Sequence, residues 1–327
     1  MGYIRGNKHI YDEWAEYYGA KGWSYADVTN TYMRFEKQTD PDILSKYRAY
    51  HGSDGPVYTR SPIQSKLESQ WFETLEKAGY KIMDDINNPD FGDKNVGMIQ
   101  QTIYNGRRLS TSSAYLEPHV NRKNLHIITN STVSKVLFED RVHHKRATGV
   151  EFYRNGIAHK VHANREIILS AGAIASPQIL MLSGIGIKSH LESLGIHLIE
   201  DLPVGDNLHD GIVTYFNVKS QETTEKDRNI QLRNLLTVDN MYEFYTSGTG
   251  PLSVLNRHTA SFNTKSNNNT QWPDAAIKSS MNLLSDGKNI IQNMDVGIQI
   301  LKPQSRGKPF SKRILILNLH QLSLKYF

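Results

Sequence analysis

The segment with the clearest chemical potential is residues 165–186, REIILSAGAIASPQILMLSGIG. Residues 167–169 form a short apolar run typical of a strand covered on both faces, and the small residues after it permit a sharp turn. Ser176 is a candidate helix N-cap, Pro177 suits the first helical turn, and Gly184 ends the helix. Such a strand, turn and helix direct free backbone N–H groups beyond the strand's carboxyl end, which suits phosphate or a flavin edge. The alternative is an ordinary crossover whose glycines only permit close packing.

Residue types and spacing exclude several other chemistries. The absence of cysteine excludes disulfides, cysteine–zinc sites, iron–sulfur clusters and thiol nucleophiles. None of the 13 histidines falls in an HExxH or comparable spacing, so we predict no metal site. No GxSxG segment supports a serine hydrolase. The basic run at residues 141–146 lies at an expected hairpin tip without aromatic interleaving, which favours a solvated loop over a nucleic-acid site.

Hydrophobic periodicity and turn residues predict the elements that must position this segment. Helices are expected near residues 11–18, over 25–36 and from Pro62 to Lys77, and Ser24 with Asp27 three residues later is a candidate N-terminal cap for the second of them. The segment HGSDGPV at 51–57 is rich in turn-forming residues. Clustered β-formers between turns predict a meander of short strands. These strands are expected at 125–128, 133–138, 148–153 and 159–162.

Length and composition indicate a globular chain with a lean core. At 327 residues the chain has room for two domains, or for one large domain with an insertion. The net charge of +5 is too small for this length to indicate nucleic acid or a membrane surface, and hydrophobic residues make up 38%. No apolar run approaches the roughly 20 residues of a membrane span. Localisation is not assigned, although glycosylation sequons at Asn130 and Asn268 leave secretion open.

Residues 172–186, GAIASPQILMLSGIG, resemble the second signature of the glucose–methanol–choline (GMC) oxidoreductases, flavoenzymes that oxidise alcohols and sugars using FAD. SGTGPL at 247–252 and WPD at 272–274 are most similar to the arthropod FAD/quinone glucose dehydrogenase-like branch. The resemblance covers about residues 1–308. Further matching segments, in the family's order, are residues 3–15, 22–25, 106–118, the hairpin formed by 133–138 and 147–152, 201–210 and 301–308.

The resemblance implies an α/β plus α+β fold, in which an incomplete FAD-binding doubly wound domain joins a partial antiparallel-sheet substrate domain. Residues 1–211 are expected to form the GMC N-terminal region, which is a partial FAD-binding domain with lid and substrate-domain insertions. Residues 212–327 are expected to form a partial substrate-binding domain with an atypical tail after about residue 309.

The resemblance also implies FAD as the cofactor, a small-molecule alcohol or sugar as the substrate, and hydride transfer to flavin N5. Val133 is the residue carried over for FAD binding, because its position in the matching strand lets backbone groups meet the adenine. By the same alignment Met1 would lie near the isoalloxazine. Gly172 and Asn207 belong to motifs near the flavin pocket, and turn formation alone explains them equally well.

Two family features are missing from these 327 residues. There is no GxGxxG segment, and His320 sits in no version of the family's catalytic histidine motif, so no catalytic residue is assigned. We therefore expect the chain to be truncated at both ends relative to the family. Two hypotheses follow. The chain is a fragment of an FAD-dependent oxidoreductase acting on CH–OH groups, or it is a catalytically inactive family remnant with a binding or structural role.

Overall fold

The structure is a computed structural model, and it describes residues 2–62, 66–141, 144–218, 236–253, 258–263, 273–285, 290–301 and 303–307. The chain divides into two compact units. The first unit comprises Met1–Arg122 and Gly211–Lys302, and the second comprises Lys123–Asp210 and Pro303–Phe327. The first unit is therefore built from two stretches of sequence that the second interrupts. The domain division expected after residue 211 stays a prediction.

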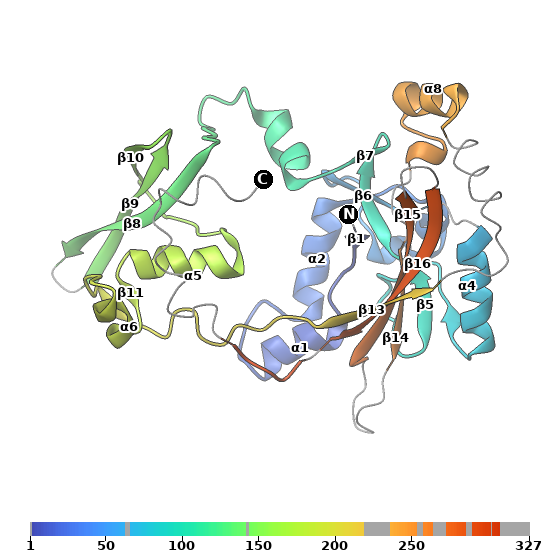
Figure 1. The fold of residues 1–327 in the computed structure, drawn as a ribbon, viewed down its shortest axis with the longest axis horizontal. Helices are drawn as coiled ribbons and strands as arrows, with labels where there is room; N and C mark the ends of the chain where they lie inside the picture. Colours follow the sequence, from blue (N-terminus) through green and yellow to red (C-terminus); the bar gives the residue numbers. More distant parts are fainter. Residues whose placement is uncertain are drawn as a thin grey trace. The chain divides into compact units, whose positions relative to one another are not determined.

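The first unit holds two sheets and the helices that pack on them (Figure 1). One sheet has the strand order β1–β6–β3–β2, with β7 paired to β6, and the other has the order β13–β16–β15–β14–β5–β4. Only β2 with β3 and β4 with β5 pair in parallel in these two described sheets. The described strands are β1 (Gly2–Tyr3), β2 (Glu36–Gln38), β3 (Val57–Arg60), β4 (Lys81–Ile82), β5 (Asn95–Met98), β6 (Gln100–Tyr104), β7 (Arg107–Arg108), β13 (Val213–Val218), β14 (His258–Asn263), β15 (Ala275–Ser285) and β16 (Ile290–Ile300). The helices are α1 (Lys8–Glu16), α2 (Tyr25–Phe35), α3 (Pro41–Tyr47), α4 (Lys66–Lys77) and α8 (Val238–Ser247), with shorter helical turns at Arg48–Tyr50, Ser112–Leu116, Glu117–His119 and Pro251–Ser253.

Apolar packing joins helix α4 to the second of these sheets. Phe72 and Leu75, one turn apart on α4, are buried together with Val96 and Met98 of β5. Burial of such side chains stabilises by about 1.5–3 kcal/mol each. This contact holds β5, which lies next to the edge strand β4, against helix α4.

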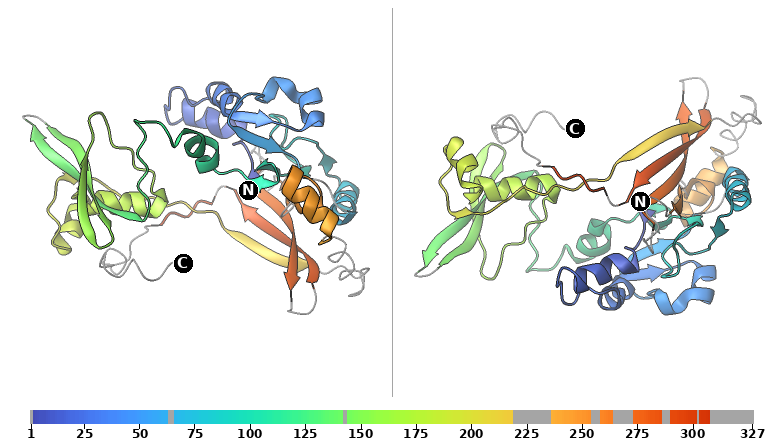
Figure 2. Two further views of the ribbon diagram at one scale, coloured as in Figure 1. Left: turned by 90° about the horizontal axis from the view of Figure 1, so that it is seen from above. Right: turned by 90° about the horizontal axis from the view of Figure 1, so that it is seen from below.

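The second unit is a three-stranded antiparallel sheet with two helices. Its strands are β8 (Ser131–Arg141), β9 (His144–Arg154) and β10 (Ile157–His162), in the order β10–β9–β8. Helix α5 (Gly172–Leu182) runs alongside this sheet (Figure 2), and the backbone N–H of Val136 on β8 donates to Ser183 Oγ at 2.8 Å. Met181 of α5 packs on Leu191 of α6 (Lys188–Ser193), and the short strands β11 (Ile185–Gly186) and β12 (Glu200–Asp201) pair in parallel.

Most predicted helices and strands are confirmed, and the exceptions have physical causes. The capping box of Ser24 and Asp27 is present on α2. Helix α5 begins at Gly172 and not at Ser176, whose hydroxyl instead accepts a hydrogen bond from the Ala171 N–H. The predicted strand at 167–169 is wrong for the described chain, where no ladder includes it and Ile168 is 76% exposed, because an apolar run becomes a strand only beside a pairing partner. Residues 125–128 are likewise irregular.

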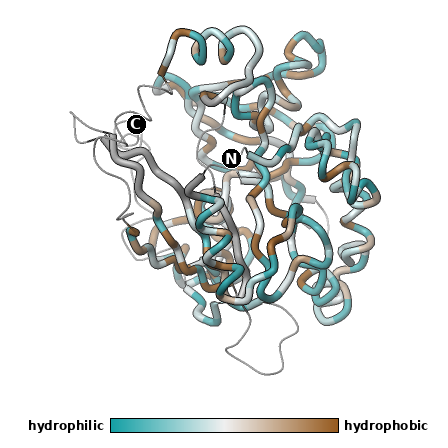
Figure 3. The backbone as a smooth tube through the Cα atoms, turned by 90° about the vertical axis from the view of Figure 1, so that its right-hand side faces the viewer, coloured by the Kyte–Doolittle hydropathy of each residue, from teal (hydrophilic) through white to brown (hydrophobic). Residues whose placement is uncertain are grey.

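Hydrophilic and hydrophobic residues alternate at short intervals along the chain (Figure 3). Within the described ranges, no helix has the length and apolar character needed to cross a membrane. The same ranges contain no group of three or more histidine or acidic side chains arranged to hold a metal ion.

Candidate functional site

The first sheet of the first unit carries polar side chains that are withdrawn from water. Glu36 and Gln38 share one face of β2, because successive side chains of a strand alternate between faces. Thr59 on β3 and Gln100 on β6 are also buried, and none of the four is more than 3% exposed. Buried polar groups are costly unless they are hydrogen-bonded, so this face must be fully partnered.

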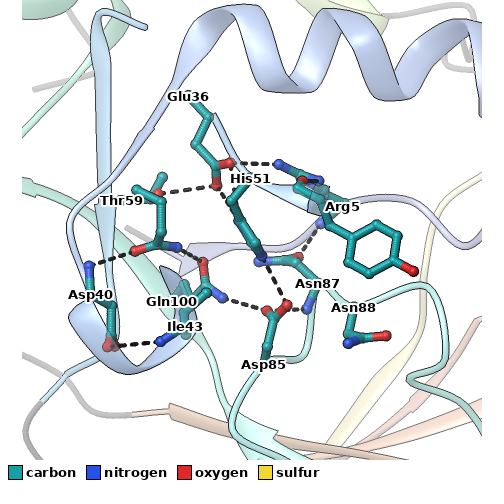
Figure 4. Close-up of polar contacts among 12 residues, drawn as sticks. Arg5, Glu36, Asp40, Ile43, His51, Thr59, Asp85, Asn87, Asn88 and Gln100 are labelled. Carbon is teal, nitrogen blue, oxygen red and sulfur yellow. Dashed lines mark hydrogen bonds and ion pairs between the residues drawn. The ribbon is translucent and has the colours of Figure 1, made fainter. Parts of the chain in front are cut away.

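A histidine supplies the central partner. His51 follows the helical turn Arg48–Tyr50, and its ring lies between two buried carboxylates (Figure 4). Nδ1 lies 3.0 Å from Glu36 Oε2, and Nε2 lies 2.9 Å from Asp85 Oδ2. All three side chains are 0% exposed. Since both ring nitrogens face carboxylates, both must donate, and the ring is an imidazolium.

Arg5, just after β1, completes the network on the other side of Glu36. Its Nη2 donates to Glu36 Oε2 at 2.6 Å, its Nε donates to Tyr3 Oη at 3.0 Å, and its Nη1 donates to the Tyr50 carbonyl. Two cations thus face two carboxylates, so the network made by Arg5, Glu36, His51 and Asp85 carries no net charge. We call these four residues the buried ionic network.

Close approach of the backbone makes this geometry possible. Gly52 presses against the end of α2, where a Cβ would collide with the carbonyl oxygen of Met33. Its N–H donates to Glu36 Oε2 at 3.0 Å. The segment HGSDGPV was predicted as a turn, but sequence reasoning missed His51. The available signal was a histidine directly before a glycine in a turn, which by itself does not reveal distant partners.

Electrostatics of the network follow from its contacts. Burial lowers the pKa of His51, but hydrogen bonds to Asp85 and Glu36 and their charges outweigh burial and raise it to about 9. Burial raises the pKa of Glu36, yet the His51 hydrogen bond and the Arg5 charge prevail and hold that pKa below its usual range. The two shifts therefore favour the imidazolium form of His51 and the carboxylate form of Glu36.

A cavity of about 200 Å³ adjoins the network within the first unit. Arg5 belongs to the network and also lines the cavity, as does Asn87, whose Oδ1 accepts a hydrogen bond from the Arg5 N–H at 2.7 Å. The Asn87 N–H in turn donates to Asp85 Oδ1 at 2.9 Å. The network therefore positions the wall of a cavity that is large enough for a small molecule.

The residues predicted to contact FAD lie in the second unit. Val133 is on β8, one of the two edge strands of its described sheet, next to a register shift between Val133 and Lys135. Gly172 opens α5 with a φ of 91°, which favours glycine, and Asn207 has a φ of 65° in a turn. Both angles fit the turn-forming role. Met1 lies outside the described residues.

Comparison with known sequences shows one family. A family model described as GMC oxidoreductase matches residues 1–213. The oxygen-dependent choline dehydrogenase of Sinorhizobium medicae is 39% identical over 218 residues, which cover 66% of this chain and 37% of the relative. The mitochondrial choline dehydrogenase of Homo sapiens is 40% identical over 217 residues, covering 66% and 34%. Oxygen-dependent choline dehydrogenase 1 of Chromohalobacter salexigens is 33% identical over 315 residues, covering 94% and 54%. The chain spans between 34% and 54% of the length of these relatives.

Solved structures share the fold. An FAD-dependent oxidoreductase from Chaetomium thermophilum superimposes with a TM-score of 0.75 at 21% identity, covering 94% of this chain and 60% of that one. Pyridoxine 4-oxidase from Mesorbium loti gives a TM-score of 0.72 at 21% identity, covering 94% and 55%. The mixed α/β fold expected from the sequence is thereby confirmed.

Proposed function

Because this chain belongs to the GMC oxidoreductase family, we propose that its protein is an FAD-dependent oxidoreductase acting on CH–OH groups of small alcohols or sugars. The observation that carries the proposal is the family match over residues 1–213, which includes the segment GAIASPQILMLSGIG. When bound, FAD supplies the hydride-accepting chemistry, while the protein binds and orients both reactants. A catalytic histidine is not assigned in this chain.

The geometry around Val133 supports its proposed part in holding FAD. An edge strand presents one row of backbone N–H and C=O groups that no neighbouring strand uses. Within the described sheet β8 is such an edge, and nearby the Val136 N–H is taken by Ser183. Val133 lies three residues earlier on the same strand and is partly buried. Backbone groups there fit hydrogen bonding to a flat heterocycle such as adenine.

The buried ionic network contributes position, not chemistry, to the proposed reaction. Each of its charged atoms is already engaged with another protein group. It holds the segment after β1 against the loop between β4 and β5, and so keeps part of the first unit in one arrangement.

The finer choice of substrate is a proposal of its own. The SGTGPL and WPD segments favour a glucose dehydrogenase-like protein, whereas the relatives reported above are choline dehydrogenases. Both choices belong to the same reaction class, so one assay separates them.

The test uses the protein that carries this sequence, purified from its source. We expect the visible absorbance of oxidised flavin, and we expect choline or glucose to bleach it under anaerobic conditions. Tetramethylammonium, which lacks the carbinol of choline, and 1,5-anhydroglucitol, which lacks the anomeric hydroxyl of glucose, are matched controls. A protein without flavin, or with a flavin that no alcohol or sugar reduces, would contradict the proposal and favour the inactive remnant.

A further inference from the structure

Exposed aromatic side chains gather where helix α1 ends and the turn to helix α2 begins. Trp14, Tyr17, Tyr18 and Trp23 are between 40% and 80% exposed, and they lie within ten residues of sequence. Neither helix contains a fully buried residue. Single exposed apolar side chains are normal on a protein surface, but a contiguous group of them marks an interaction site. We call these four residues the aromatic patch.

Backbone hydrogen bonds and ring contacts hold the patch together. The Ala20 N–H donates to the Trp14 carbonyl at 2.9 Å, and the Trp23 N–H donates to the Ala20 carbonyl at 3.2 Å. The rings of Trp14 and Trp23 lie 6.0 Å apart between their centroids. Tyr17 follows Trp14 by one helical turn, and its ring packs edge-on against Tyr18 at 4.9 Å. Because the rings already contact one another, a partner that binds them loses little affinity to the ordering of side chains.

The charge around the patch is opposite in sign to that of the chain as a whole. Residues 11–27 contain four acidic side chains and one basic side chain, whereas the chain carries a net charge of +5. Glu16 is exposed, and in the described part of the chain no hydrogen bond or ion pair engages its carboxylate. The faces of aromatic rings also attract cations, and tryptophan attracts them most strongly. Rings and carboxylates together therefore suit a positively charged partner.

The extent of the patch indicates what kind of cation it suits. Its rings come from the last turn of α1 and from the residue before Ser24, the N-cap of α2, so they offer several separate points of attachment. A chain with several cationic side chains can use these points together, whereas a single small amine uses one. Arginine fits best, because its planar guanidinium both stacks on aromatic faces and pairs with carboxylates.

We propose that the aromatic patch is a docking surface for an arginine-rich segment of a partner protein, with guanidinium groups against the exposed rings and beside Glu16. The patch lies within the first unit and includes no residue proposed to hold FAD. The inference goes beyond the proposed redox function, so either proposal can fail while the other stands.

Isothermal titration of the purified protein with a short Arg-Gly repeat peptide tests the docking surface. The matched control is the same peptide with citrulline at each arginine, because citrulline keeps the shape of the side chain without its charge. We expect saturable binding of the arginine peptide and at least roughly tenfold weaker binding of the citrulline peptide. Raising the salt concentration from about 0.05 M to about 0.5 M should weaken the arginine peptide further. No saturable binding, equal binding of the two peptides, or a preference for the neutral oligosaccharide maltohexaose would overturn the proposal.

Paired variants locate the binding on the patch. Tyr18→Ala should weaken the arginine peptide about two- to fivefold, the effect of one exposed cation–π contact, and Trp23→Ala should weaken it at least as much. Tyr242→Ala is the control and should leave binding unchanged, because Tyr242 is 70% exposed in the same unit and Tyr18 is 68% exposed. Glu16→Gln should weaken binding, whereas Glu76→Gln, at an exposed position of α4, should not. Thermal unfolding verifies that each variant is folded, and equal affinities in a variant and its control would contradict the assignment.

Discussion

Replacing His51 with glutamine removes the cation between two buried carboxylates. Glu36 and Asp85 remain at 0% exposure with the Arg5 guanidinium as the only cation left in the network. Removing one partner of a buried ion pair costs about 3–5 kcal/mol, because the other charge stays buried without compensation. Against a total stability of roughly 5–15 kcal/mol, this loss is large.

The pH dependence of the unsubstituted protein gives a second value for the free energy that the charge of His51 contributes to stability. His51 has a pKa of about 9 in the folded chain and about 6.5 when unfolded. Its stabilising contribution is therefore complete below about pH 6.5 and is lost as the pH rises through about 9. The difference corresponds to about 3 kcal/mol at 1.36 kcal/mol per pKa unit, which agrees with the cost of breaking the pair. Glu36 acts in the opposite direction. Its pKa is lowered in the folded chain, so the stability that its charge contributes is present above the usual glutamate pKa and is lost as the pH falls through the folded value.

Urea unfolding followed by circular dichroism, repeated from about pH 6 to about pH 9.5, measures both effects. The His51→Gln variant should be less stable at neutral pH, and it should lack the alkaline loss that the unsubstituted protein shows. His119→Gln is the control, because His119 is exposed in the same unit. An alkaline loss of the same size in His51→Gln, or a neutral-pH stability equal to that of the control, would refute the imidazolium bridge.

Three further substitutions test local features. Ser24→Ala should lower the free energy of unfolding by about 1 kcal/mol in the same urea titration, because it removes the α2 cap, and an unchanged midpoint would contradict the cap's role. Gly52→Ala should destabilise the first unit severely, because the added Cβ would collide with the backbone of α2. Gly211→Ala is its control and should have a small effect, because the added Cβ would meet only the end of the flexible Gln299 side chain at 3.0 Å. Similar urea midpoints for the two variants would argue against the close approach at Gly52. Val133→Pro should reduce the flavin retained on purification more than Ser131→Pro at the start of the same strand, and equal retention in the two variants would count against backbone binding at Val133.

Features that depend on residues close together in the sequence were predictable from the sequence alone. The capping box needs only Ser24 and Asp27 in one helical turn, and the spacing alone predicted it. The ionic network instead joins His51 to Glu36, 15 residues away, and to Asp85, 34 residues away. Such contacts depend on the order of strands in the sheet, which local patterns do not specify. The run at 167–169 failed for the same reason, because its apolar character does not name a pairing partner.

The ionic network also explains why the polar side chains of the cavity wall have a fixed orientation. Apolar side chains of similar volume would often stabilise a core as well as a buried ion pair does. They would give no direction to Asn87, which here accepts from the Arg5 N–H and donates to Asp85. The adjacent Asn88 lies in the same loop, where its Oδ1 accepts a hydrogen bond from the Asp90 N–H at 2.8 Å. The charges of the network therefore act on the cavity indirectly, by fixing the loop whose side chains face it.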